Sequence, residues 1–163
     1  MMWTVAALVA AVIVVAAVVF LAVGRERSWQ MIAGSADRGR FDLAEVKRSP
    51  TANDALACTP GLRDDCDFEL PRFDAAPSDL ADRIALQIET VDPLARRVDD
   101  RSDIGHLRYV TYSPNMRFPD LVNIEIVPVD EDRVGVVAYA HAQLGRLDFG
   151  ANRARLERYF DGL

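Results

Sequence analysis

Hydrophobic and polar positions divide the chain into three parts. Residues 1–24 are almost entirely apolar and contain no charged side chain. Residues 25–54 show little periodicity and predict a tether with short ordered pieces. The segments in which apolar residues recur at helical or strand spacing lie within residues 55–163, which predicts one small folded domain.

The first part has the length of a membrane span. A helix of 24 residues extends over roughly 35 Å, and a bilayer core is about 30 Å thick. A cleaved signal peptide is the competing interpretation, because Ala22, Val23 and Gly24 are small enough to be cut. A signal peptide has basic residues before an apolar core of about 7–15 residues, and this run is longer and has none before it. We therefore predict an integral membrane anchor with a single span over residues 1–24.

Two amphipathic helices are predicted in the folded part. Leu80, Ile84 and Ile88 form one apolar stripe, in a helix that we expect to begin with Ser78 as its N-cap and to end before Pro93. A second helix begins at about residue 151. Its stripe is spaced i, i+3, i+4 and i+7, and consists of Leu156, Tyr159, Phe160 and Leu163.

The segments between these helices have strand character. Residues 95–98, 106–112, 121–129 and 134–142 are predicted strands, and the acidic turn at 130–132 pairs the last two as an antiparallel hairpin. Pro128 is expected to end its strand or to place it at an edge. The fold class is therefore predicted as α+β, an antiparallel sheet of about four strands flanked by two helices on one face, preceded by the transmembrane helix.

Charge excludes one class of partner. The chain carries 25 acidic and 19 basic side chains, a net charge of −6, and all of them follow residue 24. Nucleic-acid binding needs a basic face that neutralises phosphates, so we expect no nucleic-acid partner. The same acidity makes the domain as a whole a poor match for anionic lipid headgroups, and we expect the anchor to hold it at the membrane.

The side of the membrane on which the domain lies is indicated in two opposing ways. Cys58 and Cys66 bracket the short loop CTPGLRDDC, and a disulfide between them would persist only outside the cytoplasm, whereas two free thiols are the other alternative. Basic residues next to a span favour the cytoplasmic side, and four arginines follow this one: Arg25, Arg27, Arg38 and Arg40. We predict a periplasmic domain on the strength of the cysteine pair.

The stretch DFGANRARLERY, residues 148–159, contains the densest group of polar residues before the last helix. Asp148 is placed to accept the free N–H groups of the first helical turn, and Asn152 could act as a second cap. Gly150 allows a backbone conformation that other residues avoid. Arg153 and Arg155 do not share a helix face, so they do not serve one site without help from the sheet.

The run LGRLDFGANRARLERY resembles the C-terminal signature of the domain of unknown function 1499 family, which reads approximately S-R-x-G-x-x-D-x-G-x-N-R-x-R before a helix. The loop CTPGLRDDC is similar to a Cys-Pro-rich segment of the same family, and the resemblance covers roughly residues 55–163. It implies a bacterial envelope or organelle setting and no established activity, so we expect a protein of the bacterial inner membrane. The matching residues are Gly145, Asp148, Gly150, Asn152, Arg153 and Arg155.

The chain departs from this family pattern on the strand before the signature glycine. The family usually has Arg-Ser-x-Ser-Arg there, and a polar, basic strand has become mostly apolar in this chain. If those family residues bind an anion, the resemblance implies that the ability is lost or changed here. The residues at these positions are Tyr139, Ala140, Ala142 and Gln143, with His141 between them.

Other groups of polar residues are weak candidates for chemistry. Two acidic runs could supply cation ligands but are typical of solvated turns: Asp64, Asp65 and Asp67, then Asp99, Asp100 and Asp103 with His106. His141 on an apolar strand is typical of a hydrogen-bonded core histidine. The sequence has no nucleophile elbow, phosphate loop, zinc-protease helix or dinucleotide fingerprint. We therefore predict no catalytic residue, no metal and no cofactor.

The favoured functional hypothesis is a membrane-anchored, non-catalytic domain that binds a lipid or a protein of the envelope, with one sheet face open to a hydrophobic ligand. An enzyme is the first alternative, with Asp148, Asn152 and Arg153 in one concave pocket and His141 as a base. A structural subunit of a membrane complex is the second alternative.

Overall fold

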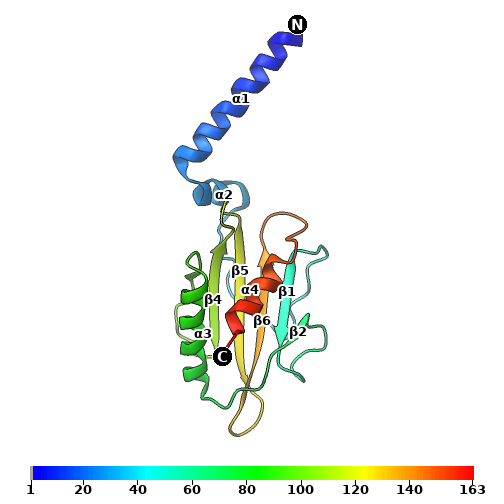
Figure 1. Ribbon diagram of the computed structural model, residues 1–163, viewed down its shortest axis with the longest axis vertical. Coiled ribbons are helices and arrows are strands. Elements are labelled where there is room, and N and C mark those ends of the chain that lie inside the picture. Colours follow the sequence, from blue (N-terminus) through cyan, green and yellow to red (C-terminus); the bar gives the residue numbers. More distant parts are fainter. Residues whose placement is uncertain (1) are drawn as a thin grey trace.

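The computed structural model describes residues 2–163, which form four helices and six strands (Figure 1). The helices are α1 (Met2–Val23), α2 (Arg25–Ala33), α3 (Pro77–Val91) and α4 (Ala151–Phe160). The strands are β1 (Asp54–Cys58), β2 (Phe68–Glu69), β3 (Arg96–Arg97), β4 (His106–Tyr112), β5 (Pro119–Pro128) and β6 (Val134–Ala142).

The strands form one mixed sheet in the order β2-β1-β6-β5-β4-β3. The prediction of about four antiparallel strands is wrong in detail, because β1 and β2 join the sheet and pair with each other in parallel. The other pairings are antiparallel, including the predicted β5–β6 hairpin. Pro128 ends β5, which is a central strand, and its partner across the hairpin is Val134.

Both α3 and α4 cover the same face of the sheet. Alternate strand residues such as Ala57, Tyr109, Val122 and Ala138 pack there with the predicted helical stripes in one buried cluster. Removal of this apolar surface from water is the main stabilising contribution to the domain. The α+β class and the position of the two helices thus agree with the sequence pattern.

The start of α3 differs from the prediction by two residues. Ala76 is the N-cap and Pro77 occupies the first helical turn, whereas the Ser78 hydroxyl donates to Asp79 within that turn. Proline suits this position because its fixed φ is helical and its missing N–H has no partner there in any case. Proline therefore determines where this helix begins.

The second face of the sheet is covered by residues 34–53. Leu43 is completely buried against Leu56, Cys58, Val137 and Tyr139. Ala36 packs in a neighbouring cluster on the same face, and the N–H of Phe41 donates to the Asn123 side chain at 3.3 Å. The expectation of an open hydrophobic face is therefore wrong, because this irregular segment, which we call the strap, lies over it.

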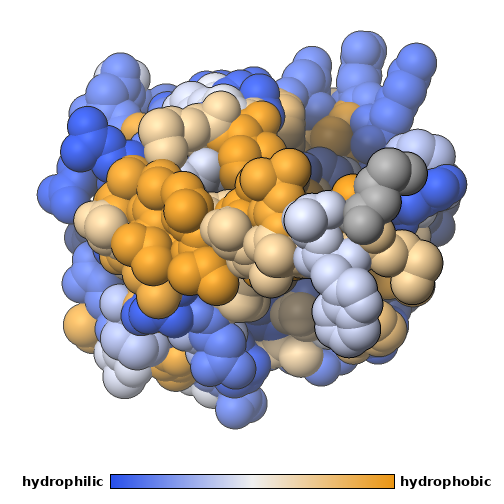
Figure 2. Space-filling view, turned by 90° about the horizontal axis from the view of Figure 1, so that it is seen from above, coloured by the Kyte–Doolittle hydropathy of each residue, from blue (hydrophilic) through white to orange (hydrophobic). Residues whose placement is uncertain are grey.

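Helix α1 extends away from the domain (Figure 1). None of its 22 residues is buried, and it is long and apolar enough to cross a membrane, a property that a signal sequence shares. Seen from above, the apolar surface is concentrated where α1 lies, and hydrophilic side chains surround it (Figure 2).

Helix α2 fixes the base of α1 to the domain. Only Gly24 separates the two helices, and the Trp29 ring packs 5.3 Å from Phe20 of α1. The same ring lies 4.7 Å from Phe118, and its N–H donates to the Met116 carbonyl at 2.7 Å. The turn between β4 and β5 therefore holds α2, and with it the base of α1, on the domain.

Candidate functional site

The signature residues occupy the β6–α4 loop and the first turns of α4. Gly145 and Gly150 have φ of 92° and 79°, values that favour glycine. Between them Phe149 also has a positive φ of 54°, and its side chain is 94 % exposed. The loop thus presents an aromatic ring to solvent in a backbone conformation that is uncommon for such a residue.

Asp148 is used to begin α4. Its carboxylate accepts the N–H of Gly150 at 2.9 Å and that of Asn152 at 3.0 Å. Its own N–H donates to the carbonyl of Ala52, just before β1. The cap that the sequence predicts for Asp148 is confirmed, and the loop is also bonded to the end of the strap.

Asn152 and Arg155 point into the interior. The Asn152 amide donates to the carbonyl of Asn53, and its oxygen accepts from Arg155, so its predicted role as a second cap is wrong. The Arg155 guanidinium lies 2.8 Å from the carboxylate of Asp120 and 3.8 Å from that of Asp92. A helix of this pitch turns the second and fifth residues of α4 to the same side, toward the sheet.

Two carboxylates share this buried network with unequal numbers of donors. Asp92 accepts the hydroxyls of Thr111 at 2.7 Å and Tyr159 at 2.6 Å. Asp120 has Arg155 as its partner, and burial raises the pKa of Asp120 to about 6 although Arg155 opposes the shift. The network connects α4 to β4, β5 and the end of α3. Its role is therefore to stabilise the fold.

The outer side of the loop borders an open hollow of about 310 Å³. Arg48 donates to both oxygens of Asp54 at 3.0 and 3.1 Å and to Asp67 at 2.9 Å. Burial alone would raise the pKa of Asp54, but the bonds from Arg48 and the Ser49 N–H lower it below the ordinary value. The hollow is lined by Arg48, Ala52, Asp54, Asp67, Leu147, Asp148, Phe149, Gly150 and Arg153.

Arg153 is held at the edge of this hollow by contacts of its own. Its Nε lies 2.9 Å from Glu157 and its Nη1 donates to the Asp67 carbonyl at 3.1 Å, while its guanidinium lies over the Phe68 ring. The charged groups that line the hollow are thus engaged with one another or with the backbone. The apolar side chains of Leu147 and Phe149 are exposed, at 59 % and 94 %.

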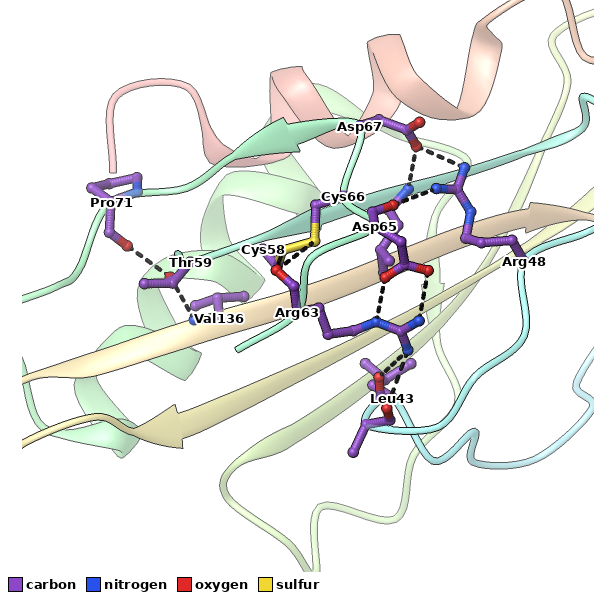
Figure 3. Close-up of a disulfide and its surroundings, with 12 residues drawn as sticks. Leu43, Arg48, Cys58, Thr59, Arg63, Asp65, Cys66, Asp67, Pro71 and Val136 are labelled. Carbon is purple, nitrogen blue, oxygen red and sulfur yellow. Dashed lines mark hydrogen bonds and ion pairs between the residues drawn. A yellow bond between two sulfur atoms is a disulfide. The ribbon is translucent and has the colours of Figure 1, made fainter. Parts of the chain in front are cut away.

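A disulfide joins Cys58 and Cys66 beside this hollow, with the two Cα atoms 6.0 Å apart (Figure 3). This is one of the two states that the sequence leaves open. The enclosed loop is also fastened to the strap, because Arg63 donates to the Leu43 carbonyl at 2.8 Å and Arg48 donates to the Asp65 carbonyl at 2.9 Å. The loop thereby places Asp67 against Arg48.

The remaining candidate residues do not converge on the hollow. His141 lies opposite Asp54 in the β1–β6 pairing and stacks on Tyr139, and burial lowers its pKa, so the ring is neutral at pH 7. His106 is buried, and burial lowers its pKa to about 4. Asp148 and Arg153 line the hollow, whereas Asn152 and Arg155 face the core.

Four of the six carboxylates in the acidic runs pair with arginines, Asp67 with Arg48 among them. Asp65 pairs with Arg63, and Asp99 pairs with Arg97 at 2.9 Å. Asp103 pairs with Arg40 at 2.6 Å. Within residues 2–163, no group of three or more His, Cys, Asp and Glu side chains gathers as a metal site would require.

Sequence reasoning missed the partners of the signature residues. Asn53 donates to the carbonyl of Gly145 at 2.9 Å. In the interior, Asp92 and Asp120 are the partners of Arg155, and at the outer hollow Arg48 pairs with Asp54. These partners lie on segments far from the signature in sequence, and no local pattern singles them out. Asp120 at the start of β5 is not singled out either, because the same strand also contains Asn123 and Glu125.

Comparison with known proteins adds one finding. A family model, described as Protein of unknown function (DUF1499), matches residues 46–163. Comparison with curated proteins and with solved structures gave no match. The match covers more than half of the chain and includes β1, the disulfide loop and the whole signature. The chain therefore belongs to the DUF1499 family of proteins of unknown function.

Proposed function

We propose that the protein is a membrane-anchored, non-catalytic binding domain that contacts a component of the membrane surface. The observation that carries the proposal is the place of its exposed apolar side chains relative to α1. Gln143 donates to the carbonyls of Ser35, just after α2, and of Pro119, so the β6–α4 loop lies at the end of the domain from which α1 leaves (Figure 1). Leu147 and Phe149, which are exposed on this loop, therefore belong to the end of the domain next to α1.

The chemistry of the hollow also favours binding over catalysis. A catalytic carboxylate or arginine needs freedom to meet a substrate, and a general base needs a proton within reach. Arg48, Asp54 and Asp67 are bonded to one another, and Asp148 is bonded to the helix. Apolar side chains that are exposed beside a frame of bonded charges are typical of a contact surface.

A photo-reactive amino acid in place of Phe149 tests this proposal in intact membranes. We expect mass spectrometry to find it crosslinked to a membrane lipid. The matched control carries the same group in place of Ile104, which is 59 % exposed. Ile104 precedes β4 and so lies at the end of that strand away from the β4–β5 turn and α2. Equal labelling at both positions would contradict the proposal, as would release of the protein from membranes by alkaline carbonate.

We further propose that the domain lies on the periplasmic side of a bacterial inner membrane. The disulfide supports this orientation because such bonds persist in oxidising compartments. Labelling Cys58 and Cys66 in lysed membranes, with and without reductant, distinguishes the two sides. Labelling only after reduction is expected, and labelling without reductant would place the domain in the cytoplasm.

A further inference from the structure

The corner between α1 and α2 is a second hollow, separate from the signature loop. It has a volume of about 430 Å³ and is open to solvent. Gly24 forms its base with a φ of 92°, the bend at which α1 ends and α2 begins. Its walls are Leu21 and Val23 from α1, Arg25, Glu26 and Arg27 from α2, and Arg117 from the β4–β5 turn.

The charge of this corner is strongly positive, although the whole chain is acidic. Glu26 is the one carboxylate among the lining residues, and it is paired with Arg96 at 2.6 Å. Three guanidinium groups therefore remain without an acidic partner in the corner. An anion that enters the hollow meets a local excess of positive charge.

Two of the three arginines are held by the fold, and Arg27 is exposed. Arg25 donates through one nitrogen to the carbonyl of Asn115. Arg117 has a positive φ of 59°, its N–H donates to the Ser113 carbonyl at 3.1 Å, and its Nη1 is buried without a hydrogen-bond partner. A buried donor without a partner is costly and is relieved by an acceptor from a ligand.

The first turn of α2 adds donors to the same corner. Its N-cap is Gly24, which has no side chain with which to accept the free N–H groups of Arg25, Glu26 and Arg27. A helix N-terminus with free N–H groups favours a phosphate group. The guanidinium and helix contributions thus point to the same class of ligand.

The apolar side of the hollow distinguishes a lipid from a free anion. Leu21 and Val23 are exposed and belong to the last turn of α1. A groove on α1 lined by Ala11, Val12, Val15, Ala16 and Val19 contains a four-residue step from Val15 to Val19 that continues to Val23. An acyl chain along this stripe would bring its headgroup to the arginines.

We propose that Arg25, Arg27 and Arg117 bind the phosphate of an anionic phospholipid in the leaflet that faces the domain. This inference rests on the proposed function, because it requires α1 to remain in the membrane. The acidic remainder of the domain is repelled by an anionic surface, so binding at this corner also keeps the signature end toward the bilayer.

The test uses the full chain in uncharged detergent micelles. Trp29 is the reporter, because its N–H is bonded to the residue before Arg117, and Trp3→Phe removes the other indole signal. Titration with phosphatidylglycerol is expected to change Trp29 fluorescence with saturation, and phosphatidylcholine to act far more weakly. Replacing Arg25, Arg27 and Arg117 together by Gln should weaken phosphatidylglycerol binding by roughly 10- to 100-fold.

The matched control replaces Arg72, Arg83 and Arg158 by Gln, three exposed arginines outside the corner that give the same change in net charge. Equal loss in both triple variants, or equal binding of the two lipids, would overturn the proposal. Inorganic phosphate that competes at the concentration of the lipid would assign the corner to free phosphate instead. The mass of the protein purified from membranes separates these outcomes from failure of the anchor, which would appear as loss of α1.

Discussion

At the scale of single residues, the signature separates into an inner and an outer set. Asn152 and Arg155 are buried in the network with Asp92 and Asp120, while Asp148 begins α4. A buried ion pair contributes little net stability but is costly to break, because the remaining charge loses its partner. The motif that identifies the family is thus, at these positions, a set of requirements for folding.

Substitution of Asp148 measures its role as a cap. Asp148→Ala should lower the free energy of unfolding by about 1 kcal/mol, and Asp148→Asn or Asp148→Ser by well under 1 kcal/mol, because both retain an acceptor oxygen for the N–H of Asn152. Urea denaturation of the three variants checks this. Large and equal losses in all three would show that capping is not what Asp148 provides.

The pKa of Asp120 makes a prediction about pH. It is raised from 3.8 to about 6, so the folded state binds this proton more tightly than the unfolded chain. The contribution of Asp120 to stability is then fully present below about pH 4 and is lost as the pH rises through 6. The loss corresponds to at most about 3 kcal/mol at roughly 1.4 kcal/mol per pKa unit.

Asp120→Asn isolates this effect, since the amide resembles the neutral acid at every pH. We expect the variant to gain stability relative to the parent as the pH rises from 4 to 7, measured by urea denaturation at each pH. Parallel stability curves for the two proteins would contradict the raised pKa.

At the scale of elements, the disulfide loop is the part with the most connections. It follows β1, leads into β2, and is bonded to the strap through Arg63 and Arg48. The side chain of Thr59 adds a bond to the carbonyl of Pro71 and accepts the N–H of Val136 (Figure 3). The short strand β2, which follows the disulfide loop, therefore depends on that loop for its position.

Removal of the disulfide should lower stability by a predictable amount. For Cys58→Ala with Cys66→Ala, we expect a loss of about 2–3 kcal/mol in the free energy of unfolding, because the bond closes a loop of about nine residues. Reductant should lower the parent to the level of the variant and leave the variant unchanged. A parent that does not respond to reductant would show that the thiols are free.

The elements that the sequence predicted are those with strong local patterns. The stripe of α3, the stripe of α4 and the β5–β6 hairpin each have apolar spacing and a turn within one continuous segment. Strand β1 reads DALAC and lacks branched residues that favour strands, and its place in the sheet comes from pairing with β6. The same applies to the buried partners of Arg155, which come from other elements.

At the scale of the whole molecule, the strap connects the end that carries α1 and α2 to the sheet. It leaves α2, covers the second face and leads into β1, and Leu43 fills the centre of its contact. The family match begins at residue 46, after Leu43 and Ala36. The structural unit thus extends further toward the N-terminus than the matched region.

Two shortened chains, both without α1, test the strap. A chain that begins at residue 25 should fold as the intact domain does, whereas one that begins at residue 46 should expose Val137 and Tyr139 and lose several kcal/mol of stability. Urea denaturation and binding of a dye specific for apolar surface measure the difference. Equal stability of the two chains would show that the strap does not contribute to the fold.

The bend at Gly24 limits which other molecules the domain can meet. Since one residue separates α1 from a helix docked on the domain, the chain has no linker between α1 and the domain with which to explore the surrounding volume. With α1 retained in a membrane, as we propose, the search of the domain would be confined to lateral diffusion in two dimensions, and its reach from the bilayer to the height of the domain itself. Any molecule that meets the signature loop would then have to lie in the same membrane or come to its surface.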